Sequence, residues 1–135
     1  MTRFVVDGGA ALRLAETGAQ VPDVHVLLAP TLLRSQVLST MHEAVHRGEV
    51  PAAEARRRVA AVGKLRIRLL GDAVLRGTAW QVADRLGWES TYAAEYVALT
   101  LLQADALVTL DADLARAVAP EVRTAPFDAL LDPTA

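Results

Sequence analysis

Two aspartates, Asp7 and Asp111, follow short apolar segments that are typical of buried strands. The segment Phe4–Val6 leads into Asp7, and the segment Ala106–Leu110 leads into Asp111. In an open α/β sheet, ligands bind beyond the carboxyl ends of the strands, so these two carboxylates can meet in one cleft. Hard oxygen ligands in such a position are typical of a Mg²⁺-dependent hydrolase. We therefore expect Asp7 and Asp111 to mark the functional site.

The elements that must position these carboxylates alternate between strand and helix patterns. Strands are predicted at Arg3–Val6, Val24–Leu28, Ile67–Leu70, Ala106–Leu110 and Val122–Thr124. Helices are predicted at residues 10–16, 31–47, 51–62, 72–86, 91–102 and 111–117. Gly8 and Gly9 are expected to form a tight turn ahead of the first helix. This alternation predicts βαβ units, and therefore a three-layer α/β/α domain with a mostly parallel central sheet.

Composition narrows the class of protein. A chain of 135 residues with 53% apolar residues predicts one domain, residues 1–135, with a sizeable core. The absence of cysteine excludes disulfides, thiolate metal sites and thiol nucleophiles. No apolar run reaches the length of a membrane span, and no signal peptide pattern precedes the first strand, so we expect a cytoplasmic protein without a membrane partner.

Several motifs, in this order, resemble those of the PIN domain, and in particular of the VapC toxins of bacterial toxin–antitoxin pairs. The most specific are a helix similar to the Tyr-Asp-Ala-x-Tyr-x-Ala-Leu helix of the family and a strand similar to its Leu-Val-Thr-x-Asp strand. The resemblance spans nearly the whole chain and rests on Phe4–Asp7, Ala29–Leu33, Ala79–Gly87, Tyr92–Leu99 and Leu107–Asp111.

The resemblance implies an activity, a cofactor and partners. PIN domains of this kind hydrolyse RNA phosphodiesters, with three or four carboxylates holding one or two Mg²⁺ or Mn²⁺ ions. A divalent ion offsets the charge of the scissile phosphate and lowers the pKa of a bound water, so the chemistry requires such a cluster. The resemblance also implies a homodimer, an RNA substrate and an antitoxin-like protein partner.

The chain departs from the family pattern at two of the four acids. Asp7 and Asp111 stand at the first and fourth positions, but Gln36 replaces the second acid and Ala93 replaces the third. The motifs therefore predict the fold more strongly than the catalysis.

Other side chains could replace these acids or support the site. Asp113 is the best substitute, because the same strand end presents it together with Asp111. Glu43 is on the same helix face as Gln36 but about 10 Å further along the axis, so we expect it at the surface. Gln36 can coordinate through its amide oxygen or hydrogen-bond an aspartate. Thr109 is expected on the same side as Asp111, where it can support a carboxylate or a phosphate.

The helix that carries Ala93 offers one more carboxylate, Glu95. Two residues of an α-helix correspond to about 200° of rotation, so Glu95 is expected to face away from the cleft and could reach it only around the helix. Tyr92 and Tyr96, one turn apart on that helix, are expected to serve packing.

Two hypotheses of different classes follow. The first is a VapC-like Mg²⁺-dependent endoribonuclease with an eroded metal site, in which Asp7, Asp111 and Asp113 hold the ion with help from Gln36. The second is a non-catalytic PIN-fold module that binds RNA or a protein partner. The retained Asp7 and Asp111 favour the first, and the substitutions at positions 36 and 93 favour the second.

Overall fold

Five parallel strands form the centre of the computed structural model, which describes all residues from 1 to 135. The strands are adjacent in the order β3-β2-β1-β4-β5. Their bounds are β1 Arg3–Val6, β2 Val26–Pro30, β3 Ile67–Leu70, β4 Ala106–Val108 and β5 Thr124–Ala125. The predicted fold class, an α/β domain with a mostly parallel sheet, is confirmed.

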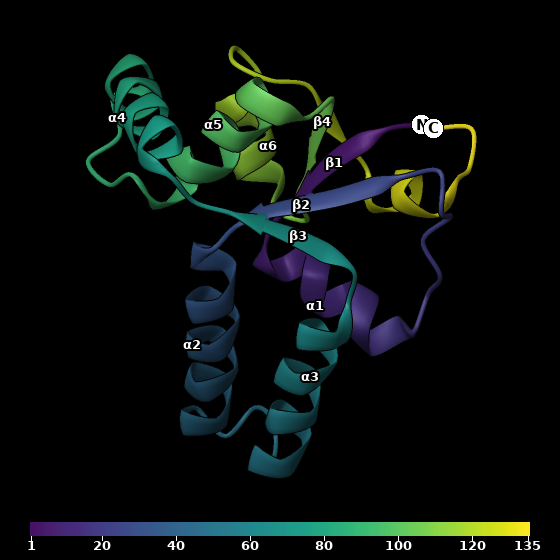
Figure 1. Cartoon of the computed structure of the whole chain (residues 1–135). Helices are drawn as coiled ribbons and strands as arrows, with labels where there is room; N and C mark the ends of the chain where they lie inside the picture. Colours follow the sequence, from purple (N-terminus) through teal and green to yellow (C-terminus); the bar gives the residue numbers. More distant parts are fainter.

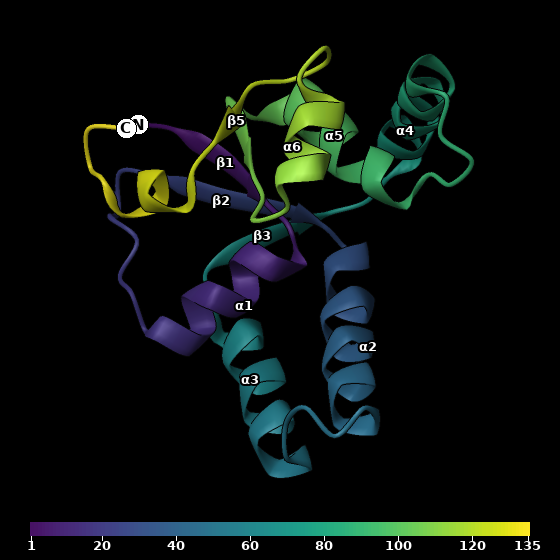
Figure 2. The same cartoon turned by 180° about the vertical axis from the view of Figure 1, so that it is seen from behind.

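Helices cover both faces of this sheet (Figures 1 and 2). In Figure 1, α1, α2 and α3 lie below the sheet, whereas α4, α5 and α6 lie above it. The bounds are α1 Gly8–Thr17, α2 Leu32–His46, α3 Ala52–Lys64, α4 Ala73–Leu86, α5 Tyr92–Gln103 and α6 Ala112–Val118, followed by the 3₁₀ helix η1 Phe127–Leu131. None of these helices combines the length and the apolar character that crossing a membrane requires.

The core is divided by the alternation of side chains along the strands. Val5 of β1 and Leu107 of β4 belong to the larger apolar cluster, which contains the buried faces of α4 and α5. Phe4 and Val6 point to the opposite face, where they pack with α1 and with Leu130 of η1. Because β1 and β4 are buried on both faces, the residues that follow them start from fixed positions.

The order of the strands reverses between β1 and β4. From β1 the sheet grows outward through β2 to β3, and the chain then crosses to add β4 and β5 on the other side of β1. Register pairs Val6 with Val108, so the two strands end at the same level. A reversal of this kind opens a crevice at the carboxyl ends of the strands, which is where α/β folds bind ligands.

The capping residues identified in the sequence predict several helix ends correctly. Asp72 caps α4 by accepting from the Leu75 amide at 2.8 Å. Gly18 and Gly87 end α1 and α4 with positive φ values of 64° and 70°, which glycine adopts without strain.

Several boundaries differ from the sequence-based predictions, and three of the differences have a clear physical reason. Gly8 and Gly9 do not form a turn but begin α1, because Asp7 caps the helix directly after β1. The strand β4 ends at Val108 rather than Leu110, since Thr109 and Leu110 leave the sheet to bring Asp111 to the start of α6. The strand β2 includes Pro30 as its last residue, where β2 pairs with β3.

Candidate active site

Asp7 and Asp111 occupy equivalent positions at the ends of neighbouring strands. Each aspartate caps the helix that follows it. Asp7 Oδ1 accepts from the Ala10 amide at 2.9 Å. Asp111 Oδ1 accepts from the amides of Asp113 and Leu114, at 2.9 and 3.1 Å. In both residues this leaves Oδ2 without a backbone donor, so each cap also presents a carboxylate oxygen to the crevice.

The environment of Asp7 is the more desolvated of the two. Burial raises the pKa of the Asp7 carboxyl above its ordinary value of 3.8, and the charge of Asp111 raises it further. Hydrogen bonds from the Thr109 side chain and the Ala10 amide act in the opposite direction and do not cancel the effect of burial. The repulsion by Asp111 means that the two carboxylates share one electrostatic environment.

Thr109 affects both aspartates. Its Oγ1 accepts from the Asp111 amide at 3.1 Å, and the same side chain helps to lower the pKa of the Asp7 carboxyl. The hydroxyl therefore holds the backbone ahead of Asp111 and contributes to the environment of Asp7.

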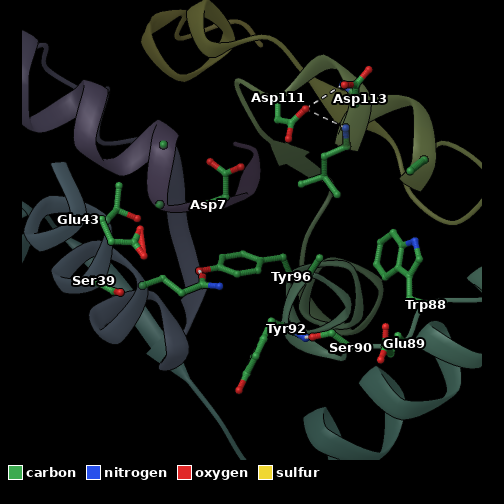
Figure 3. A pocket seen from close by; sticks show the side chains of 17 residues that line it. Asp7, Ser39, Glu43, Trp88, Glu89, Ser90, Tyr92, Tyr96, Asp111 and Asp113 are labelled. Carbon is green, nitrogen blue, oxygen red and sulfur yellow. Dashed lines mark hydrogen bonds between the residues drawn. The ribbon is translucent and has the colours of Figure 1, made fainter. Parts of the chain in front are cut away.

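Asp113 turns away from this pair. It is exposed and forms an ion pair with Arg116, one turn further along α6. Figure 3 shows its carboxylate pointing away from Asp7. The preference for Asp113 as a third ligand overlooked Arg116, which draws the carboxylate along the helix surface.

The helix α2 forms one wall of the crevice. Gln36, Ser39 and Glu43 all line it, and the Asp7 carboxylate lies between those of Glu43 and Asp111 in the view of Figure 3. Glu43 is exposed, as expected, and it also lines the crevice, because the crevice extends along α2 for two turns. Gln36 does not bond to an aspartate: its Oε1 accepts from the Tyr96 hydroxyl at 2.6 Å.

The helix α5 and the loop before it form the opposite wall. Ala93 and Tyr96 line the crevice from α5, and Trp88 and Glu89 line it from the loop. Glu95 does not line it. Burial raises the pKa of its carboxyl, and the charge of Arg76 partly opposes this.

The two tyrosines expected to serve packing differ from each other. Tyr96 is buried, but its hydroxyl belongs to the crevice through Gln36. Tyr92 is 61% exposed and does not belong to the buried core.

Together these walls enclose an open cleft of about 910 Å³. Five carboxylates line it and no lysine, arginine or histidine does; the acidic residues are Asp7, Glu43, Glu89, Asp111 and Asp113. The field in the cleft therefore favours a cation and opposes a free anion.

The carboxylates of the cleft fit one divalent ion but not two. Nowhere are three or more His, Cys, Asp or Glu side chains gathered in the geometry of a metal site. Asp7 and Asp111 alone fit the way in which Mg²⁺ is usually held, by one or two carboxylates with several waters retained. A pair of ions does not fit, because positions 36 and 93 supply no carboxylate.

Comparison with solved structures finds the same architecture elsewhere. The chain matches the crystal structure of PAE2754 from Pyrobaculum aerophilum with a TM-score of 0.74 at 22% identity, covering 96% of this chain and 93% of that one. The chain adopts a PIN-like fold. A second match, in the crystal structure of VapBC2 from Rickettsia felis bound to a DNA fragment from their promoter, has a TM-score of 0.58 at 10% identity and covers 92% and 98% of the two chains. No protein-family model matches the sequence, and no curated protein does.

Within this PIN-like fold, the sequence-predicted residues divide into two groups. Asp7, Gln36, Ala93, Asp111 and Asp113 all line the one cleft, whereas Glu95 lies outside it. The cleft residue undervalued from sequence is Glu43. Glu43 lies seven residues after Gln36, and residues seven apart share a helix face. This spacing is the sequence feature that indicates a place for Glu43 on the same wall.

The desolvation of Asp7 predicts that neutralising it stabilises the metal-free protein. Asp7→Asn keeps a side-chain oxygen for the helix cap and removes the charge. Because the folded-state pKa lies above the ordinary value of 3.8, stability from Asp7 is complete below pH 3.8 and lost as the pH rises through the folded pKa. The variant should therefore be more stable than the parent at neutral pH, with a difference that shrinks toward pH 3.8.

Urea unfolding in the presence of a chelator, repeated across this pH range, measures the effect. Asp84→Asn, which removes an exposed charge on α4 outside the cleft, is the matched control. A variant that is less stable than the parent at neutral pH would show that Asp7 is not desolvated.

Proposed function

We propose that the protein is a VapC-like, metal-dependent endoribonuclease whose site has been reduced to two carboxylate ligands. The observation that carries the proposal is the placement of Asp7 and Asp111. They cap two helices at the crevice of a PIN-like fold, in an acidic cleft, and the desolvated Asp7 lacks a cationic partner. A divalent cation is the partner that such a pair favours.

An RNA phosphodiester is the substrate that this arrangement suits. When bound, Mg²⁺ or Mn²⁺ would offset the phosphate charge and lower the pKa of a water. Asp7 and Asp111 would hold the ion, Thr109 would keep the backbone ahead of Asp111 in place, and Glu43 would add negative charge on the facing wall. Because no basic side chain lines the cleft, a bound cation would strengthen phosphate binding there.

We extend the proposal to a toxin–antitoxin pair. The similarity to a chain of the VapBC2 crystal structure supports an antitoxin-like protein partner. An apolar groove between α2 and α3, the two helices that stand side by side in Figure 1, offers a surface for it, with Leu38 60% exposed at its centre. Trp80 on α4 is 67% exposed, which supports the proposed homodimer through a second apolar surface.

A second candidate function is a non-catalytic PIN-fold module that binds RNA or a protein partner. It is favoured by the hydrogen bond between Gln36 and Tyr96, which satisfies the position of the second acid without any ion. Ala93 removes another ligand from the facing wall. The two candidates differ in whether hydrolysis occurs.

Cleavage of RNA separates them. With Mn²⁺ at millimolar concentration, the purified protein should cleave single-stranded RNA, because Asp7 and Asp111 can hold one ion. Asp7→Asn should abolish this cleavage while Asp84→Asn, a charge removal outside the cleft, leaves it unchanged. Gel analysis of labelled RNA gives the rates. Absence of cleavage by the parent supports the non-catalytic module, and cleavage that survives Asp7→Asn points to a contaminating nuclease.

Restoring the third acid should strengthen the site. Ala93 is half-buried and lines the cleft, so Ala93→Asp adds a carboxylate to the wall that faces α2. We expect a Mn²⁺ affinity at least about tenfold higher, which corresponds to about 1.4 kcal/mol of added binding free energy. Calorimetric titration measures it, with Ala73→Asp, an exposed position outside the cleft, as control. Equal affinities for the two variants would place the metal elsewhere.

A further inference from the structure

Gln36 stands where the resemblance places a carboxylate, yet its amide oxygen is already committed. Oε1 accepts from the Tyr96 hydroxyl at 2.6 Å, across the space between α2 and α5. A glutamine has one acceptor oxygen and one nitrogen with two donor hydrogens. The group left for a ligand of the cleft is therefore the donor, Nε2.

Tyr96 keeps this orientation in place. The residue is only 4% exposed, and the pKa of its hydroxyl is raised by desolvation first and then by the charges of Asp7 and Glu95. The hydroxyl therefore retains its proton and remains a donor at neutral pH. If the Gln36 amide were turned over, Nε2 could still donate to the Tyr96 hydroxyl oxygen, but Oε1 would then face the carboxylates of the cleft. Repulsion between these oxygens favours the observed orientation, in which Nε2 faces the cleft.

The donor nitrogen is free to bind a ligand. Nε2 makes no hydrogen bond within the chain, while every buried side-chain nitrogen or oxygen has a partner. Gln36 is half-buried and lines the cleft, so its nitrogen is open to solvent on that wall. Its two free N–H groups, like the Ser39 and Thr40 hydroxyls on the same helix, are uncharged donors that can approach an anion without repulsion.

A phosphate oxygen is the acceptor that this arrangement suits. A carboxylate at position 36 would repel a phosphate unless a cation lay between them, whereas an amide can donate to it directly. We infer that Gln36 is a substrate-positioning residue, donating from Nε2 to a non-bridging phosphate oxygen of RNA, and that it is not a metal ligand. This inference rests on the proposed RNA substrate and extends it with the residue that orients the phosphate.

The inference separates RNA affinity from metal affinity. Gln36→Ala removes the donor and should weaken binding of short single-stranded RNA about tenfold, the effect of one hydrogen bond to a charged acceptor. Its Mn²⁺ affinity should stay within about twofold of the parent, because no ligand is lost. Tyr96→Phe keeps the ring but frees the amide to rotate, so RNA binding should weaken by a smaller factor.

Gln36→Glu tests the sign of the charge. It should bind Mn²⁺ more tightly than the parent and bind RNA more weakly when metal is absent. Fluorescence anisotropy of a labelled RNA measures RNA affinity, once with a chelator and once with Ca²⁺ in place of Mg²⁺ to slow cleavage. Calorimetry measures Mn²⁺ affinity. Gln81→Ala on the exposed face of α4 is the matched control.

Each outcome bears on the inference or on the proposed activity. If Gln36→Ala lost as much Mn²⁺ affinity as RNA affinity, Gln36 would be a metal ligand and the inference would be overturned. Unchanged RNA binding in Gln36→Ala, or no RNA binding by the parent, would overturn it as well. A parent that binds RNA through Gln36 but neither binds Mn²⁺ nor cleaves RNA would leave the inference standing and reject the proposed hydrolase.

Discussion

The carboxylates of Asp7 and Asp111 are held in place by the helices that they cap. In each residue Oδ1 accepts backbone amides at the start of a helix, so the side chain cannot rotate without exposing those donors. Asp7 follows β1 directly and Asp111 lies three residues after the end of β4, and these strands end at the same level on either side of the reversal of strand order. Helix capping thus fixes the direction of both free oxygens before any ligand arrives.

This dual role explains why the first and fourth acids can persist while the second and third do not. Asp7 and Asp111 support α1 and α6 in addition to any chemistry, whereas positions 36 and 93 lie on helix faces and cap nothing. At position 36 the hydrogen bond from Tyr96 ties α2 to α5 across the cleft without a metal. The cleft is therefore stable with fewer charges, and its selectivity for a cation rests on the remaining carboxylates.

The sequence predicts what local chemistry determines. The strand before Asp7, the cap Asp72 and the αL glycines Gly18 and Gly87 depend on residues within one turn, and the structure confirms them. The reading of Gly8 and Gly9 as a turn was wrong because Asp7 serves as a cap, which makes two glycines acceptable in the first turn of a helix.

What could not be predicted depends on how distant elements meet. Gln36 and Tyr96 are 60 residues apart, and their hydrogen bond requires the distance between α2 and α5. Glu43 enters the cleft because of the direction of α2 relative to the sheet, which its own sequence does not specify. Asp113 lines the cleft, but its carboxylate pairs with Arg116, a local ion pair that competes with the site.

The central claim is that Asp7 and Asp111 form one weak divalent-ion site. Calorimetric titration of the parent protein with Mn²⁺, alongside Asp111→Asn and Asp84→Asn, tests it most directly. We expect the parent and Asp84→Asn to bind one Mn²⁺ ion per chain and Asp111→Asn to bind none. Two ions per chain, no binding by the parent, or binding that survives Asp111→Asn would contradict it.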